Sequence, residues 1–327
     1  RIRQIKVDIR AMLQERRNDA TRNGGPPAGR YWSEHCRAFA YLMDLPEQHF
    51  ADIRLHTYHL TADTYLGYEM FANRDAFRCS YDARVVTDDI PAYLILNEPA
   101  GGIGFRYPDG RFLNHDIARY QRAVNALWRC AEVVNLRMTS THRRISILEI
   151  GGGYGAMAYH LHRILPGSTY IIVDLPETLL LTASYLTLHN PDKQVYLYDP
   201  RDPTRIEDPE LRYDFILVPP WRLWELCRWQ FDLAINMHSF QEMSGEEVRD
   251  YVRFIAGTLK PCGAMYSENR DTQPGNDELE SVTGLLAQRF SLTRVVHPGP
   301  VLPVAERVRS ALRAAGVAAG LLRRPVP

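Results

Sequence analysis

A glycine-rich stretch that follows an acid is the part of the sequence that points most directly to chemistry. Glu149 precedes glycines at positions 151, 152, 153 and 155, with Tyr154 among them. Glycine lacks a Cβ atom, so the backbone of such a turn can pass close to a bound ligand. Asp174 ends the next apolar run, 25 residues after Glu149, and an acid at that place in dinucleotide-type folds accepts hydrogen bonds from ribose hydroxyls. Together the two features predict a cofactor that contains a nucleoside.

Two cofactors compete for a site of this kind, NAD and S-adenosyl-L-methionine. NAD sites carry GxGxxG and place the pyrophosphate on a helix N-terminus, whereas Gly151, Gly153 and Gly155 form GxGxG. The carboxylate of Glu149 would repel a pyrophosphate and attract a sulfonium and an α-ammonium group. The sequence therefore favours S-adenosyl-L-methionine, with S-adenosyl-L-homocysteine as the product. A fold that has lost its cofactor and serves as an interaction module is a third hypothesis.

From residue 144 onward, short apolar runs alternate with helical patterns. The predicted strands are 144–150, 170–174, 231–236 and 264–269, and the predicted helices are about 155–165, 177–189 and 244–259. This alternation predicts right-handed βαβ crossovers, an α/β fold class and a doubly wound, Rossmann-like sheet. One further strand is expected before residue 231, but two candidates occur, 194–198 and 214–218. One of them is an insertion, and the sequence leaves open which.

The first part of the chain lacks this alternation and predicts a mainly helical cap. Residues 1–20 have the spacing of a basic amphipathic helix, suited to packing or to a homodimer contact. Further predictions are helices in 34–45 and 115–135, one or two short strands in 84–99 and a hairpin over 105–114. We therefore expect an N-terminal cap or substrate domain (1–135), a Rossmann-like cofactor-binding domain (136–303) and a C-terminal tail or helix (304–327).

Composition excludes several classes of protein. The 327 residues carry 39 basic and 39 acidic side chains, a net charge of +0, which argues against nucleic-acid or membrane-surface partners. The five cysteines include no CxxC pair, so we expect neither a disulfide scaffold nor a zinc site, but reduced and mostly buried thiols. Neither a long apolar run nor a signal peptide is visible, and no ligand spacing suggests a metal. These features indicate a cytoplasmic protein.

Residues 147 to 270 resemble the class I S-adenosylmethionine-dependent methyltransferases. Within that class they look most like the sugar O-methyltransferases of bacterial antibiotic and polysaccharide pathways. Four stretches carry the resemblance: LEIGGGYGAMA (148–158), YIIVDLPETLLLTASYL (170–186), FDLAINMHSFQEMS (231–244) and YVRFIAGTLKPCGAMYSENR (251–270). Residues 97–120 match more loosely, and neither 1–90 nor 275–327 contributes.

The resemblance implies a set of cofactor-binding residues. Glu149, Gly151 and Gly153 would shape the methionine side of the site, with Tyr154 lining it. Asp174 would hold the ribose, and Leu175 would pack near the adenine. The adenine would also meet the end of the third strand, at either Asp199 or the stretch from Pro219 to Trp221. We favour Pro219 and Trp221, because a short helical piece and the fourth strand follow them directly.

Methyl transfer to an alcohol calls for a base, because a hydroxyl is a poor nucleophile until its proton is removed. His238 and Glu242 follow the fourth predicted strand, and a helix beginning near Ser239 would bring them within reach of each other. A histidine oriented by a carboxylate can serve as a base at neutral pH. Glu242 could instead cap that helix together with Ser239. Further candidates at the ends of the predicted strands are Asn236, Glu268 and Asn269.

The expected acceptor is a small molecule, a hydroxyl of a sugar or of a glycosylated natural product. Polar residues of the N-terminal half suit a hydroxyl-rich acceptor: Asn97, Glu98, Asn114, His115 and Asp116. A phenol, amine or carboxylate acceptor on another secondary metabolite is the main alternative. A nicotinamide oxidoreductase is the alternative from another class of enzyme.

Overall fold

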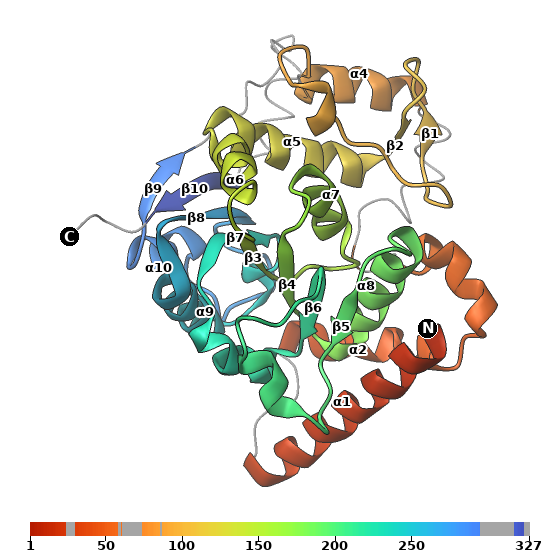
Figure 1. The fold of residues 1–327 in the computed structure, drawn as a ribbon, viewed down its shortest axis with the longest axis vertical. Helices are drawn as coiled ribbons and strands as arrows, with labels where there is room; N and C mark the ends of the chain where they lie inside the picture. Colours follow the sequence, from red (N-terminus) through yellow and green to blue (C-terminus); the bar gives the residue numbers. More distant parts are fainter. Residues whose placement is uncertain (24–29, 58–59, 61–73, 86, 295–316, 324–327) are drawn as a thin grey trace.

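A computed structural model describes residues 1–23, 30–57, 60, 74–85, 87–294 and 317–323. Its centre is an eight-stranded sheet with the order β5-β6-β4-β3-β7-β8-β10-β9 (Figure 1). The strands are β3 (Ser146–Ile150), β4 (Thr169–Val173), β5 (Val195–Leu197), β6 (Phe215–Val218), β7 (Phe231–Met237), β8 (Leu259–Arg270), β9 (Ser291–Arg294) and β10 (Val317–Arg323). Strands β3 to β8 pair in parallel, and β10 pairs antiparallel with both β8 and β9.

Helices cover the sheet because its central strands are apolar on both faces. Every residue of β4, β6 and β7 is buried, as parallel sheets between helical layers require. The helices of this part are α7 (Ala156–Ile164), α8 (Pro176–His189), α9 (Gly245–Thr258) and α10 (Val282–Ala287), with 3₁₀ turns η4 (Pro203–Glu207), η5 (Pro220–Arg228) and η6 (Phe240–Glu242). The predicted α/β, Rossmann-like fold class is confirmed.

The sheet order settles which strand candidate is the insertion. Strand β6 pairs directly with β4, from Tyr170 opposite Phe215 to Val173 opposite Val218. Strand β5 pairs only with β6, so it is an addition at the outer edge. The loop after β6 therefore lies beside Asp174, whose backbone N–H donates to Val218 O at 3.1 Å.

The N-terminal half is built mainly of helices. It contains α1 (Ile2–Asn23), α2 (Arg30–Ala38), η1 (Ala40–Met43), η2 (Glu47–His56), α4 (Arg74–Arg84), η3 (Ala92–Leu94), α5 (His115–Arg129) and α6 (Glu132–Ser140). The predicted hairpin is present as β1 (Phe105–Arg106) and β2 (Phe112–Leu113). Helix α1 packs against α8 (Figure 1), and its apolar residues Ile5, Ile9 and Met12 are buried.

Two local predictions in this half are wrong. The described residues of 84–99 form no strand but the 3₁₀ turn η3 and extended backbone. Their backbone groups do not form the hydrogen-bond ladder of a strand. The N–H of Leu96, for example, donates to the side chain of Gln121 at 2.7 Å. The helix predicted over 115–135 is interrupted after Arg129, because Ala131 adopts a left-handed conformation with φ +61°.

The C-terminal segment is also different from the prediction of a tail or helix. Residues Val317–Arg323 form β10, inserted between β8 and β9 in the main sheet. Its alanines favour a helix locally, but pairing with β8 and β9 satisfies its backbone groups on both sides, and Leu322 is buried. The rest of the predicted tail, 304–316 and 324–327, lies outside the described residues.

All five cysteines are free, as expected, but they are not mostly buried, because Cys79, Cys227 and Cys262 are exposed. Over the described residues, no helix is both long and apolar enough to cross a membrane.

Candidate functional site

The predicted site residues lie along one edge of the sheet, where β3, β4, β6 and β7 end. Strands β4 and β7 flank β3 on opposite sides. In doubly wound sheets the ligand crevice lies at such a switch point, outside the carboxyl ends of the strands. We call this edge the rim: the glycine turn after β3, Asp174 after β4, the stretch from Pro219 to Trp221 after β6, and the segment 238–242 after β7.

The glycine turn requires residues without a side chain. Gly151, Gly153 and Gly155 have φ values of +72°, +57° and +90°, in the left-handed region that glycine tolerates. The N–H of Gly153 donates to Oδ2 of Asp174 at 3.0 Å, which ties the turn to the end of β4. A Cβ atom on Gly153 would meet no described atom within 4 Å, so this part of the turn faces open space.

Three carboxyl groups at the rim influence one another electrostatically: Glu149, Asp174 and Glu242. Removal from water raises the pKa of Glu149 to about 8, although the Tyr170 hydroxyl donates to its Oε2 at 2.9 Å. The same cause raises the pKa of Asp174 to about 7 and that of Glu242 to about 8. Asp174 repels each of the other two carboxylates.

The rim carboxylates Glu149, Asp174 and Glu242 are not isolated from positive charge, because Arg119 attracts Glu242 and opposes the rise of its pKa. Across the part of the chain that the structure describes, no Lys, Arg or His nitrogen lies within salt-bridge distance of any of them. Glu149 is buried, whereas Asp174 and Glu242 remain partly accessible. A cation at the rim would favour the ionised forms of these carboxyl groups.

His238 faces Glu268 rather than the predicted partner, Glu242. Its Nε2 atom lies 3.5 Å from Oε1 of Glu268, and its backbone N–H donates to Glu268 O at 2.7 Å. Burial alone would raise the pKa of Glu268, but His238, Arg122 and the Tyr266 hydroxyl lower it to about 2. Glu268 is therefore an ionised carboxylate held against the imidazole.

The predicted pairing of His238 with Glu242 depends on a helix that does not begin at Ser239. Only the short 3₁₀ turn η6 follows, and α9 begins at Gly245 after a capping box of Ser244 and Glu247. The capping alternative is also wrong, because the Ser239 side chain caps no helix and donates instead to Ile150 O at 3.1 Å. Glu242 accepts a hydrogen bond from the indole Nε1 of Trp32, in α2, at 3.1 Å.

The two asparagines of the rim brace the strand ends. Asn236 donates to Ile150 O at 2.9 Å, which links the ends of β7 and β3. Asn269 donates to Oδ1 of Asn236 at 2.8 Å, which adds the end of β8. Both side chains are buried and bonded to each other, so they hold the strand ends in place, while Oδ1 of Asn269 keeps no hydrogen-bond partner among the described residues.

The predicted adenine side contains a contact that the sequence did not suggest. The N–H of Leu175 donates to Oδ1 of Asp174 at 2.8 Å, and buried Pro219 precedes η5. The indole of half-buried Trp221 donates to Oε2 of Glu15, in α1, at 2.9 Å. Asp199 follows the added edge strand β5 and accepts from Arg201 Nε at 2.7 Å.

Glu98 and Asp116, expected to face an acceptor, are instead buried around Arg54. Arg54 Nε donates to Glu98 at 2.7 Å and Nη2 donates to Asp116 at 3.0 Å, with all three side chains inaccessible to solvent. The guanidinium lies 4.2 Å from the centre of the Tyr154 ring, and Tyr185 meets that ring edge-on at 5.0 Å. Tyr154 therefore packs toward the N-terminal half.

The other polar residues predicted to face an acceptor also make structural contacts. Asn97 Oδ1 accepts from Phe112 N at 2.5 Å. Asn114 caps α5 by accepting from Ile117 N at 2.7 Å, and His115 packs edge-on against Phe77. Neither Arg54 nor Trp32 nor Glu15 stands in a local motif, so only long-range contacts reveal them.

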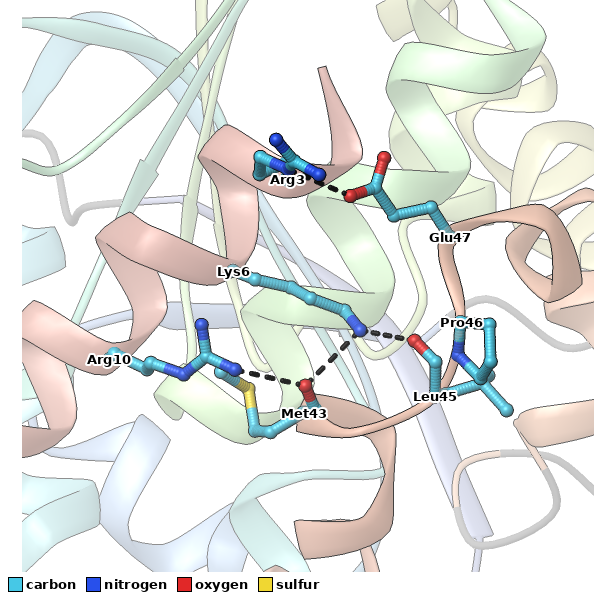
Figure 2. Close-up of a pocket in the computed structure, with 7 residues that line it drawn as sticks. All are labelled: Arg3, Lys6, Arg10, Met43, Leu45, Pro46 and Glu47. Carbon is cyan, nitrogen blue, oxygen red and sulfur yellow. Dashed lines mark hydrogen bonds and ion pairs between the residues drawn. The ribbon is translucent and has the colours of Figure 1, made fainter.

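A cavity of about 260 Å³ lies between α1 and the segment 43–47, as Figure 2 shows. Its cations are engaged with the protein: Lys6 and Arg10 donate to Met43 O, each at 3.2 Å, and Arg3 pairs with Glu47 at 3.1 Å. No rim residue lines it. In the described ranges, no three His, Cys, Asp or Glu side chains gather as a metal site.

The chain is a doubly wound α/β protein with three carboxyl groups, those of Glu149, Asp174 and Glu242, near the carboxyl edge of its sheet. No family model and no curated protein matches the chain. Solved structures resemble it in fold, and those named here are methyltransferases. An O-methyltransferase family protein from Burkholderia thailandensis has a TM-score of 0.38 and 14% identity, covering 64% of this chain and 60% of that chain.

Two further structures illustrate the range of these neighbours. The N-methyltransferase NodS from Bradyrhizobium japonicum has a TM-score of 0.38 and 13% identity, over 64% of this chain and 98% of its own. The mitomycin 7-O-methyltransferase MmcR has a TM-score of 0.31 and 15% identity, over 63% of this chain and 58% of its own. At these identities the likeness concerns the fold alone.

Proposed function

We propose that this protein is an S-adenosyl-L-methionine-dependent methyltransferase. The observation that carries the proposal is the left-handed glycine turn beside the rim carboxylates Glu149, Asp174 and Glu242, which form no salt bridge with the residues that the structure describes. S-adenosyl-L-methionine brings a sulfonium and an α-ammonium group to such a rim, whereas the pyrophosphate of NAD would meet negative charge.

Asp174 can hold the ribose while it keeps its present hydrogen bonds. Its two carboxylate oxygens each accept one backbone N–H, from Gly153 and from Leu175. A carboxylate has about four lone-pair sites, so Asp174, which also accepts from the Thr178 side chain, can still accept from a ribose hydroxyl. The glycine turn would receive the methionine part of the cofactor, and the loop after β6 would receive the adenine.

We infer that His238 acts as the general base and that Glu268 orients it. Nε2 of His238 faces the ionised Glu268, which orients the ring and leaves Nδ1 to accept a proton. Bound S-adenosyl-L-methionine would supply the methyl group for in-line transfer to the acceptor oxygen as its carbon–sulfur bond breaks, and Nδ1 of His238 would take the hydroxyl proton. The products are the methyl ether and S-adenosyl-L-homocysteine.

The acceptor class rests on sequence resemblance. The stretches that resemble the sugar O-methyltransferases favour a hydroxyl of a sugar or of a glycosylated natural product as the small-molecule partner. Trp32 and Glu242, which α2 brings together at the end of β7, would face this acceptor. An aromatic ring beside a carboxylate is suited to a sugar, whose ring stacks and whose hydroxyls donate.

Calorimetry with S-adenosyl-L-homocysteine tests the cofactor. We expect binding to the wild type, a loss of at least about tenfold in affinity for Asp174→Ala, and no change for Asp199→Ala, which alters the loop after the added strand β5. NAD should not bind. Tighter binding of NAD than of S-adenosyl-L-homocysteine would overturn the proposal, as would equal effects of the two variants.

A further inference from the structure

We propose that helix α1 closes the adenine end of the cofactor site and that Glu15 is the positioning residue that holds Trp221 there. The proposal rests on the proposed function and adds to it a part of the chain that carries no motif. The carboxylate of Glu15 accepts hydrogen bonds from two separate loops at the edge of the sheet, the one after β5 and the one after β6.

Three side chains donate hydrogen bonds to the carboxylate of Glu15. Tyr198, just after β5, donates to Oε1 at 3.1 Å. Trp221 and Arg222, just after β6, donate to Oε2 at 2.9 Å and to Oε1, respectively. The Glu15 side chain is only 14% exposed. One partly buried acid thus ties together the two outer loops of the rim side.

Helix α1 also contacts the segment that follows β4. Arg16, the next residue, forms an ion pair with Glu177 in the first turn of α8, three residues after Asp174. Nearer the start of the helix, Asp8 forms an ion pair at 3.2 Å with Arg201, which follows β5. Helix α1 therefore contacts the segments that follow β4, β5 and β6, while its apolar stripe packs on α8.

The hydrogen bond to Glu15 restricts the orientation of the Trp221 side chain. A tryptophan side chain turns about two torsions, and its indole N–H is its single donor. The hydrogen bond to Glu15 fixes the plane of the ring at the strand end where the adenine is expected. Without Glu15, the indole N–H would lose this acceptor, and Arg222 would keep Glu225, at 2.8 Å. A ring that is held in advance binds a flat base at lower entropic cost.

The test is a double-mutant cycle on Glu15 and Trp221, read by calorimetry with S-adenosyl-L-homocysteine and, separately, with adenosine. We expect Glu15→Ala and Trp221→Phe each to weaken both ligands by about tenfold, and the double variant to weaken them no further than Trp221→Phe alone. Glu15→Gln, which keeps the size of the side chain, should fall between the wild type and Glu15→Ala. Arg3→Ala removes an exposed ion pair from the same helix and should bind like the wild type.

The outcomes separate this inference from the proposed function. If the wild type binds and the effects of Glu15→Ala and Trp221→Phe simply add, Glu15 does not act through Trp221 and the inference fails alone. Unchanged affinity in Glu15→Ala, with only a lower melting temperature, leads to the same conclusion. A wild type that binds neither ligand overturns both. If Glu15→Ala does not fold, the same cycle run with Glu15→Gln and Trp221→Phe decides the question.

Discussion

The imidazole Nε2 of His238 lies 3.5 Å from Oε1 of Glu268, and the His238 backbone has φ +61°. A left-handed conformation at a residue other than glycine costs roughly 1–2 kcal/mol. Here the conformation is fixed by the hydrogen bond from His238 N to Glu268 O. The end of β8 therefore sets both the backbone and the ring of His238, which follows the neighbouring strand β7.

The first prediction concerns the base. Replacing His238 by Ala should lower kcat by about 10²–10⁴-fold, the usual contribution of a general base, with little change in S-adenosyl-L-homocysteine affinity. Glu268→Gln should lower kcat less, because the ring remains but loses its orienting charge. Steady-state kinetics and calorimetry on the same samples measure both quantities. Equal turnover in wild type and His238→Ala would exclude His238 as the base.

The second prediction separates the strain at position 238 from its chemistry. His238→Gly and His238→Ala both remove the imidazole, but only glycine tolerates φ +61° without cost. We expect His238→Gly to be more stable than His238→Ala by about 1 kcal/mol in denaturant unfolding, with both equally inactive. The opposite order of stability would mean that the left-handed backbone relaxes in the variants.

The third prediction is a pH dependence of cofactor binding. Because the pKa values of Glu149 and Asp174 are raised to about 8 and about 7, part of the rim is protonated at pH 6 in the free protein. A sulfonium cation favours the ionised forms, so affinity for S-adenosyl-L-methionine should rise between pH 6 and 8.5, with release of protons. Calorimetry in buffers of different ionisation enthalpy counts those protons. Glu149→Gln should flatten the pH profile, and proton uptake on binding would contradict the assignment.

The same pKa shifts have a consequence for the stability of the free protein. A carboxyl group with a pKa raised on folding binds its proton more tightly in the native state, so stability falls as pH rises from about 4.5 toward 8. We expect Glu149→Gln to remove part of this fall. Thermal unfolding of the two proteins at pH 5.5 and pH 8 provides the comparison, and parallel melting curves for both would argue against a shifted Glu149.

A fourth prediction concerns the buried ion cluster. Arg54→Met would leave Glu98 and Asp116 without the cation they surround, and it should lower the free energy of unfolding by about 3–5 kcal/mol. Adding Glu98→Gln and Asp116→Asn should recover much of that loss, because the uncompensated charges disappear. The exposed Arg3→Ala is the control and should unfold like the wild type. No recovery in the triple variant would point to packing on Tyr154 as the main role of Arg54.

The fifth prediction compares two glycines of the turn. A Cβ on Gly151 would lie 2.2 Å from Ser239 Oγ, so Gly151→Ala should lower stability by about 1–3 kcal/mol beyond its backbone cost. Gly153→Ala meets no described atom and should lower stability by only about 1 kcal/mol. Its methyl group points into the space expected for the cofactor, so it should weaken S-adenosyl-L-homocysteine binding strongly. Unchanged binding in Gly153→Ala would place the ligand elsewhere.

The sequence alone determined the features that depend on neighbouring residues. The alternation after residue 144 predicted the parallel strands, because buried runs and amphipathic helices leave short-range patterns. The glycine turn and Asp174 stand at strand ends, and the carboxyl ends of parallel strands share one edge, so their meeting followed from order along the chain. The hairpin at 105–114 followed from Pro108, Asp109 and Gly110 in the same way.

Tertiary structure decided every contact between distant segments. Glu268 lies 30 residues after His238, and only the pairing of β7 with β8 brings the two together. Glu15 meets Trp221 because α1 packs across α8. Val317–Arg323 became a strand because β8 and β9 offered it backbone partners that outweighed the local helical preference. Such choices depend on which surfaces meet after collapse, and no local pattern of residues records that.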